Sequence, residues 1–296
     1  MRLASKLVSR AVKRIQKKGL LDTSGFALHI LSGLADFYLN PFAKKQSSLP
    51  KSDYNRIKKD FEASGIEVVP YQIDINEFKA WLSKANFPQY YSNSYGDIFS
   101  EKALEHYVGS KLLDLHKGDI LIDVAASSSP WHEISERMYG CTSYALDLAF
   151  PPGINGKKIG ADATAMPIPY GFATKMALHC AYEMFEGDAD IRLLPEAYRV
   201  LAGGGKMVIL PLYMHNFYFA DSSPLSDRRD LDYQRAERVW RDDGYKVRFS
   251  RKYSVDAFLD RIVNRLPGFK LKIYYIENEK DVSTACYLKF AAVFEK

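Results

Sequence analysis

The sequence predicts an α/β protein built on a doubly wound, mostly parallel sheet. Between Asp119 and about Phe217, short apolar runs alternate with stretches of helical spacing, which is the pattern of βαβ units. A chain of 296 residues, 47% apolar and 26% charged, can also bury a large core. The expected strands are 120–124, 143–148, 176–179 and 206–212. A helix over 190–201 is expected to stop at three glycines, 203–205.

The flanking segments differ from this core. Two apolar runs near the C-terminus, 271–276 and 287–294, predict a terminal hairpin. A helix is expected over about 103–113, and the turn-forming residues of 40–60 predict a loop. We therefore expect a helical and aromatic N-terminal extension, 1–99, and a core domain, 100–296. A lid insertion is expected at about 213–253 in that domain.

Charge is concentrated at the N-terminus. The chain has 41 Lys and Arg against 36 Asp and Glu, but residues 1–18 hold seven basic residues and no acid, so residues 19–296 sum to −2. A nucleic-acid-binding face over the whole body is thus disfavoured. On a helix, the apolar residues of 1–18 would lie on one side. Peripheral contact with an anionic membrane, an organelle transit peptide and a helix packed on the body all fit this pattern.

The spacing of cysteines and histidines and the length of the apolar runs bear on the cellular compartment and on metal binding. Three widely spaced cysteines without a CxxC pair favour a reducing compartment, and no Cys/His cluster has zinc-ligand spacing. No apolar run reaches 18 residues, and charges interrupt the apolar positions at the start of the chain. We expect a cytoplasmic protein with no metal site, and leave open a peripheral membrane contact.

Residues that directly follow strands are the candidates for ligand binding, because ligands of open α/β sheets bind at the carboxyl ends of strands. The first strand is followed by small residues (Asp123-Val-Ala-Ala-Ser-Ser-Ser-Pro130), which let a backbone approach a ligand. An acid that could accept hydrogen bonds from a ribose, Asp147, ends the second strand. An Asp-Ala pair, Asp162-Ala163, follows a short connection. Residues 125–130 contain no glycine, which excludes a nicotinamide fingerprint, and Gly203-Gly-Gly-Lys206 precedes a strand, which excludes a phosphate-binding Walker loop.

The stretch from about Ser100 to His215 resembles the core of class I S-adenosylmethionine-dependent methyltransferases that act on small molecules. The resemblance implies a Rossmann-like sheet whose last strands include an antiparallel member. It also implies S-adenosyl-L-methionine as cofactor, held by Asp123, Ala125, Ser127, Asp147, Leu148, Asp162 and Ala163. The family usually has glycines in the first-strand loop where this chain has Ala125, Ser127 and Ser129. Since alanine and serine disfavour positive φ, a different loop path is expected.

Methyl transfer to a hydroxyl needs an aligned acceptor and a base. His179, at the end of the expected strand 176–179, is the first candidate for the base or a substrate contact. Glu183 is expected to orient it, and His215 is the second candidate. A packed histidine that touches the cofactor is the alternative for His179.

The insertion after the expected strand 206–212 is rich in Arg, Asp, Tyr and Trp. This composition suits a lid over a polar, ring-bearing acceptor, and it suits a solvated helix equally well. The expected function is methyl transfer to a hydroxyl of a small molecule or glycan, without a nucleic-acid partner. A methyltransferase-like module that binds a partner without catalysis is the alternative.

Overall fold

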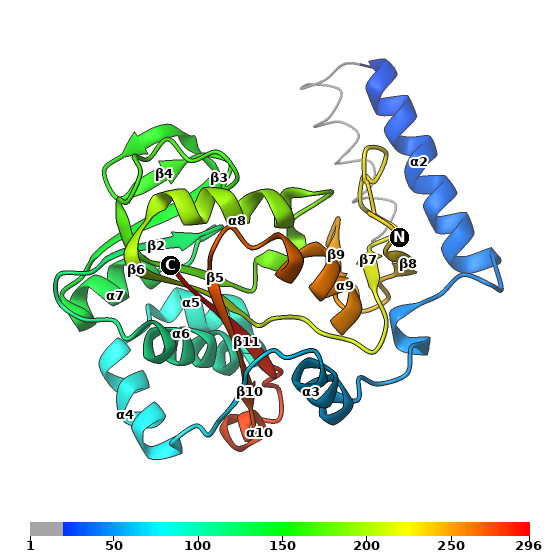
Figure 1. Ribbon diagram of the computed structural model, residues 1–296. Coiled ribbons are helices and arrows are strands. Elements are labelled where there is room, and N and C mark those ends of the chain that lie inside the picture. The colour runs from blue at the N-terminus through cyan, green and yellow to red at the C-terminus, as the bar shows by residue number, and fades with distance from the viewer. Residues whose placement is uncertain (1–19) are drawn as a thin grey trace. The chain divides into compact units, whose positions relative to one another are not determined.

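The computed structural model describes residues 20–296 and divides the chain into two compact units (Figure 1). Unit 1 comprises residues 1–51 and 219–251, and unit 2 comprises 52–218 and 252–296. The helix predicted for residues 1–18 lies outside the described residues. The division differs from the boundary expected at residue 99, because residues 52–99 contribute a strand and helices to unit 2.

Unit 2 contains an eight-stranded sheet in the order β1-β10-β11-β6-β5-β2-β3-β4. Its strands are β1 (Val68–Tyr71), β2 (Ile120–Val124), β3 (Thr142–Asn155), β4 (Lys158–Gly160), β5 (Ala173–His179), β6 (Leu201–Leu210), β10 (Lys270–Ile276) and β11 (Phe290–Glu295). All recorded pairings are parallel except those of β11, which runs antiparallel to both β10 and β6. The predicted C-terminal hairpin is β10–β11, with Lys270 opposite Glu295. The Rossmann-like sheet with one antiparallel C-terminal strand is therefore confirmed.

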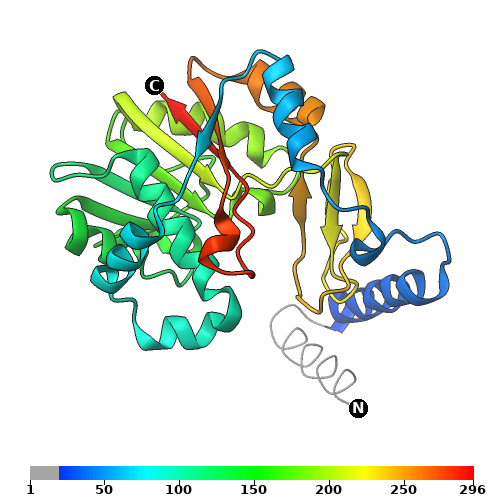
Figure 2. The ribbon, with the colours of Figure 1, turned by 90° about the horizontal axis from the view of Figure 1, so that it is seen from below.

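The helices of unit 2 cover both faces of this sheet (Figures 1 and 2). Alternate strand residues point to opposite faces, so Ile122 packs with α3, α8 and α9 while Leu121 packs with α4, α6 and α7. These helices and the shorter α5 and α10 are α3 (Tyr54–Ala63), α4 (Ile75–Ala85), α5 (Gln89–Tyr95), α6 (Phe99–Leu113), α7 (Trp131–Tyr139), α8 (Ala189–Val200), α9 (Val255–Arg261) and α10 (Glu279–Val282).

Two local predictions were wrong. Residues 40–60 contain the start of helix α3, which the Asp53 side chain caps by accepting a hydrogen bond from the Arg56 N–H (3.0 Å). Helix α8 ends at Val200 and β6 begins at Leu201, so the three glycines lie inside the strand rather than in a turn before it. At Gly205 a Cβ would lie 2.9 Å from the Ala202 carbonyl oxygen, which explains the need for glycine.

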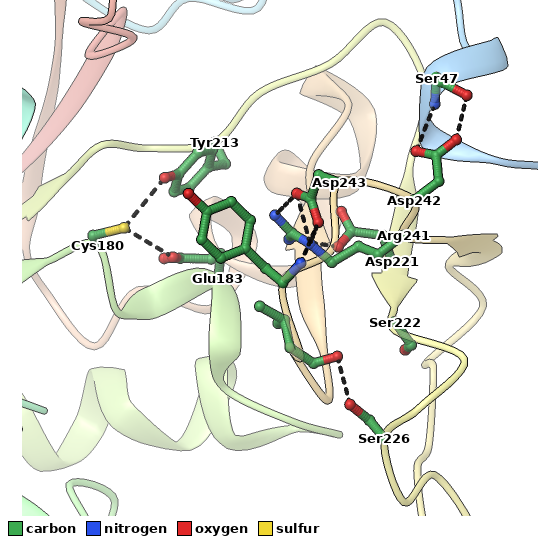
Figure 3. A network of polar contacts seen from close by, with 12 residues as sticks. Ser47, Cys180, Glu183, Tyr213, Asp221, Ser222, Ser226, Arg241, Asp242 and Asp243 are labelled. Atoms are coloured by element: carbon green, nitrogen blue, oxygen red, sulfur yellow. Dashed lines mark hydrogen bonds and ion pairs between the residues drawn. The ribbon is translucent and has the colours of Figure 1, made fainter. Parts of the chain in front are cut away.

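Unit 1 is smaller and is made from two separate chain segments. Its elements are α2 (Leu20–Leu39), the short 3₁₀ turn Gln46–Ser48 and a three-stranded sheet in the order β8-β7-β9, with β7 (Phe219–Ser222), β8 (Glu237–Trp240) and β9 (Ser250–Lys252). The two segments are joined by side chains. Trp240 donates its indole N–H to Asp36 (2.7 Å), and Asp242 accepts the backbone N–H of Ser47 (3.2 Å; Figure 3).

Within residues 20–296, no helix combines the length and apolarity needed to cross a bilayer.

Candidate active site

The loop between β2 and α7 keeps a left-handed backbone at two positions where it has no glycine. Ala125 has φ 57° and Ser127 has φ 49°. Alanine and serine thus adopt here the positive φ that they ordinarily disfavour, and the predicted difference in loop path stays a prediction. A non-glycine residue in this region costs roughly 1–2 kcal/mol, and such strain concentrates at functional sites. Hydrogen bonds hold the loop: the Ala126 N–H donates to the Leu146 carbonyl (3.0 Å) and the Ser127 N–H to Asp147 (2.7 Å).

A cavity of about 450 Å³ lies at the carboxyl ends of these strands. Its lining combines small alanines, three carboxylates, one arginine and the apolar side chains Met184 and Phe185. Five of the seven predicted cofactor residues line it, namely Ala125, Asp147, Leu148, Asp162 and Ala163. The volume lies in the range of pockets that bind small molecules.

Two of the three carboxylates of the cavity, Asp147 and Asp162, also hold the local backbone. Asp147 accepts the N–H groups of Ser127 (2.7 Å) and Ala149 (2.8 Å), and Asp162 accepts the N–H of Thr164 (2.8 Å). The bonds to Ala149 and Thr164, each two residues beyond the acid, form Asx-type turns. Each carboxylate oxygen has a second lone pair, so both acids can also accept hydrogen bonds from a ligand.

Asp123 lies beneath the cavity rather than in its lining. It is 1% exposed, and its Oδ1 lies 3.0 Å from His179 Nδ1. The carboxylate that orients His179 is thus Asp123, where we had expected Glu183. Asp123 fixes the end of β2 to the end of β5.

His179 is packed between other rings. It meets His106 edge-on at 4.4 Å and Trp131 at 6.0 Å, and His106 stacks on Trp131 at 4.7 Å. The His179 Nε2 atom is buried without a hydrogen-bond partner among residues 20–296, and a Cβ at Gly109 would lie 2.9 Å from it. Burial lowers the pKa of His106 well below its ordinary value, which keeps that ring neutral.

A buried polar cluster begins one residue beyond His179. The Cys180 thiol donates to Glu183 Oε1 (3.4 Å) and lies 3.3 Å from the Tyr213 hydroxyl (Figure 3). The Tyr287 hydroxyl lies 3.8 Å from the same sulfur. Burial raises the pKa of Cys180 to about 12, so this cysteine is a neutral thiol.

Glu183 is one of the carboxyl groups of this cluster. Its Oε2 atom is buried and has no partner in the described part of the chain. Burial raises the pKa of Glu183, and the positive charge of Lys252 opposes that effect. A carboxyl group with a raised pKa and an unpartnered oxygen holds a proton more readily than an ordinary carboxyl group.

Helix α6 brings an ion pair to the same cluster. Lys102 Nζ lies 3.1 Å and 3.2 Å from the Glu105 carboxylate oxygens, and Glu101 accepts the Tyr287 backbone N–H (2.8 Å). Sequence reasoning missed these three residues and the two tyrosines, Tyr213 and Tyr287. The available signal was the mixture of charged and apolar residues throughout 101–108, which is unusual for a helix buried on all sides.

His215 has a local structural role. Its Nδ1 accepts the Phe217 N–H (3.3 Å), and its ring meets that of Phe217 edge-on at 4.4 Å. No group of three or more His, Cys, Asp or Glu side chains within 20–296 could hold a metal ion.

The turn Cys180–Met184 separates the cavity from the polar cluster. Ala181 and Met184 line the cavity, whereas Cys180 and Glu183 belong to the cluster. One turn thus contributes to two adjoining places, a cavity lined by carboxylates and a buried polar cluster.

The strand order with its antiparallel member is that of the class I S-adenosylmethionine-dependent methyltransferases, so the chain has the fold of that class. The resemblance seen in the sequence is confirmed at the level of the fold. No family model matches the sequence, and no curated protein matches it.

Several solved methyltransferases are similar in structure. The 1,6-didemethyltoxoflavin-N1-methyltransferase of Burkholderia thailandensis, bound to 1,6-didemethyltoxoflavin and S-adenosylhomocysteine, is 11% identical with a TM-score of 0.46, over 76% of this chain and 91% of that one. The geranyl diphosphate C-methyltransferase of Streptomyces coelicolor, with Mg²⁺, geranyl-S-thiolodiphosphate and S-adenosyl-L-homocysteine, is 11% identical with a TM-score of 0.41, over 83% and 98%. A methyltransferase of Mesorhizobium loti is 14% identical with a TM-score of 0.41, over 64% and 96%.

Proposed function

We propose that this protein is an S-adenosylmethionine-dependent methyltransferase that acts on a hydroxyl group of a small molecule or glycan. The observation that carries the proposal is the turn Cys180–Met184, which borders both the cavity and the polar cluster. The proposed role of a lid for the insertion after β6 stays a prediction.

The cavity fits the cofactor in chemistry and size. Asp147 would accept hydrogen bonds from the ribose hydroxyls, and Asp162 with Ala163 would lie beside the adenine, whose faces Met184 and Phe185 would contact. The alanine at position 125 leaves room for the methionine moiety. When bound, S-adenosylmethionine supplies an electrophilic methyl group on a sulfonium.

Among the three predicted catalytic residues, the geometry favours Glu183 as the general base. Its unpartnered Oε2 would take the proton of the acceptor hydroxyl, while the Cys180 thiol holds Oε1. Lys102 and Lys252 add positive charge that favours the ionised carboxylate. His179 and Asp123 would then act as positioning residues for the loop after β2.

Calorimetry on the full chain tests cofactor binding. We expect heat on titration with S-adenosylmethionine and with S-adenosylhomocysteine. The absence of heat with both would refute the proposed methyltransferase activity. The alternative, a methyltransferase-like binding module, predicts that no hydroxyl acceptor in a panel of sugars and phenols becomes methylated even when the cofactor binds.

Comparison of Glu183→Gln with His179→Gln and His215→Gln tests the choice of base. Removal of a general base costs roughly 10²–10⁴-fold in turnover. We expect that loss for Glu183→Gln with cofactor affinity unchanged, and a smaller loss for His215→Gln. An equal or larger loss for His179→Gln, at unchanged cofactor affinity, would transfer the role to His179.

A further inference from the structure

Helix α2 in unit 1 exposes an apolar stripe. Leu28 is 68% exposed, Leu31 58%, Tyr38 68% and Leu39 80%, and Phe42 just beyond the helix is 90% exposed. A surface helix of a globular protein ordinarily places charged residues on its outer face. Contiguous exposed apolar side chains of this kind mark a surface that contacts another molecule or a membrane.

The stripe lies beside two other faces of the same helix. At roughly 100° per residue, the exposed apolar positions 27, 28, 31, 35, 38 and 39 fall on one arc that contains no charge. The opposite face is buried through Phe26, Ile30 and Phe37. Between the two faces lie His29, Ser32 and Asp36, which line a pocket.

This pocket, of about 590 Å³, contains two arginines without carboxylate partners among residues 20–296. Arg228 lies over the Trp240 ring at 4.4 Å and Arg238 over the Tyr233 ring at 5.0 Å. The other charges are satisfied within the pocket, since Lys44 pairs with Glu237 and Asp36 accepts from Trp240.

Arg228 is built into the pocket rather than placed on its rim. It is 6% exposed, its Nη1 donates to the Ser223 carbonyl (2.8 Å), and its Nε is buried without a partner in the described chain. Gly33 permits this placement, because a Cβ there would overlap the guanidinium. Burial lowers the pKa of Arg228, and the charge of Arg238 adds to this effect. A bound anion would offset both the burial of Arg228 and the repulsion between these two like charges.

We propose that unit 1 docks on an anionic membrane surface, with the α2 stripe in the interface and Arg228 and Arg238 on the phosphate of a lipid headgroup. Guanidinium groups bind phosphate through paired hydrogen bonds. Phe42 belongs to both the pocket lining and the exposed apolar set, which joins the two parts of the surface. The sequence that precedes α2 adds seven basic residues and no acid. Charge complementarity therefore favours an anionic lipid surface over another protein.

Vesicle co-sedimentation of the full chain tests this proposal. We expect binding to phosphatidylcholine vesicles that contain phosphatidylserine, and little binding to phosphatidylcholine alone. Leu31→Glu with Leu39→Glu should weaken binding at least about tenfold, because carboxylates are repelled from the interface. Arg238→Gln should weaken it about fivefold, the loss expected for one basic contact.

Two matched variants serve as controls. Ile154→Glu changes a 51% exposed apolar residue of unit 2, and Arg235→Gln removes an exposed arginine that does not line the pocket. Both should bind vesicles like the unchanged protein, and circular dichroism should show all variants folded.

Three results would overturn the proposal. In the first, the stripe variant binds anionic vesicles undiminished, so that the basic N-terminal sequence alone suffices. In the second, glycerol phosphate binds in calorimetry in an Arg238-dependent manner while vesicles do not, which indicates a soluble phosphate ligand. In the third, vesicles do not bind and the stripe variant dissociates an oligomer, which indicates a protein partner.

Discussion

Three carboxyl groups of unit 2, those of Asp123, Asp147 and Glu183, differ in what they contact, and the differences suit them to different roles. Asp123 Oδ1 lies 3.0 Å from His179 Nδ1, and this contact joins the end of β2 to the end of β5. Asp147 keeps lone pairs toward the cavity after it has accepted two backbone N–H groups. Glu183 and Asp123 each retain a buried oxygen with no partner within 20–296, but Glu183 is bonded to a thiol rather than to an imidazole, and burial raises its pKa. The three acids thus suit a structural, a cofactor-binding and a proton-transfer role.

Asp147→Asn tests the cofactor-binding role. The amide oxygen can still accept a backbone N–H, but it loses the charge-assisted bonds to ribose hydroxyls, each worth about 1.5–3 kcal/mol. We expect S-adenosylhomocysteine affinity to fall at least about tenfold in calorimetry. Asp60→Asn, on the exposed face of α3, should leave the affinity unchanged. Equal affinities for the two variants would remove Asp147 from the ribose site.

The pH profile of turnover tests the proton-transfer role. Burial raises the pKa of Glu183, and the base must be ionised to act. We therefore expect turnover to rise with pH through a value above the ordinary carboxyl range. A profile that is flat from acid to neutral pH would contradict Glu183 as the base.

At the scale of elements, regular strands were predictable and the details of their ends were not. The run 120–124 coincides with β2 because β-branched residues bounded by turn residues specify a strand locally. The parallel sheet was predictable from strand–helix alternation, and the hairpin from two apolar runs separated by a polar stretch. Residues 52–99 were not assigned to the sheet, because the pairing of β1 with β10 joins segments about 200 positions apart and leaves no local signal. The composition of 101–108 indicated an unusual helix, but the polar cluster itself was missed because Lys102, Cys180, Tyr213 and Tyr287 meet only in the fold.

The loop after β2 offers a direct test of stored strain. Ala125→Gly should raise the free energy of unfolding by up to about 1 kcal/mol, because relief of positive φ exceeds the added entropy of an unfolded glycine. Ala126→Gly is the matched control, since its φ is not positive, and it should lower stability by roughly 0.5–1 kcal/mol. Denaturant unfolding of both variants measures the difference. A loss of stability in Ala125→Gly equal to that in Ala126→Gly would mean that the loop is not strained.

At the scale of the whole molecule, buried glutamates should make the free energy of unfolding depend on pH. Burial raises the pKa of Glu101 to about 7 and also raises the pKa values of Glu105 and Glu183. Between the unfolded value near 4.5 and these raised values, the folded state binds more protons than the unfolded state. The contribution of these three glutamates to the free energy of unfolding should therefore fall as pH rises from about 4.5 to 7.

Glu101→Gln isolates one of these groups. The shift of Glu101 corresponds to about 3 kcal/mol, so the variant should show a weaker decline of stability over that pH range. Denaturant unfolding at several pH values measures the slope, and Glu67→Gln, an exposed residue, should leave it unchanged. A slope in Glu101→Gln identical to that of the unchanged protein would show that Glu101 ionises normally.

Unit 1 is formed from residues 1–51 and 219–251, and this discontinuity has a consequence for biosynthesis. The partners of α2, Arg228 and Trp240, emerge from the ribosome only after all of 52–218 has been made. At roughly 5–20 residues per second, the first segment waits on the order of 10–40 s for the second. During that interval the buried side of α2 lacks its partners and, like its outer stripe, is open to a chaperone or a bilayer. Delivery to a membrane could thus begin while the chain is still being translated.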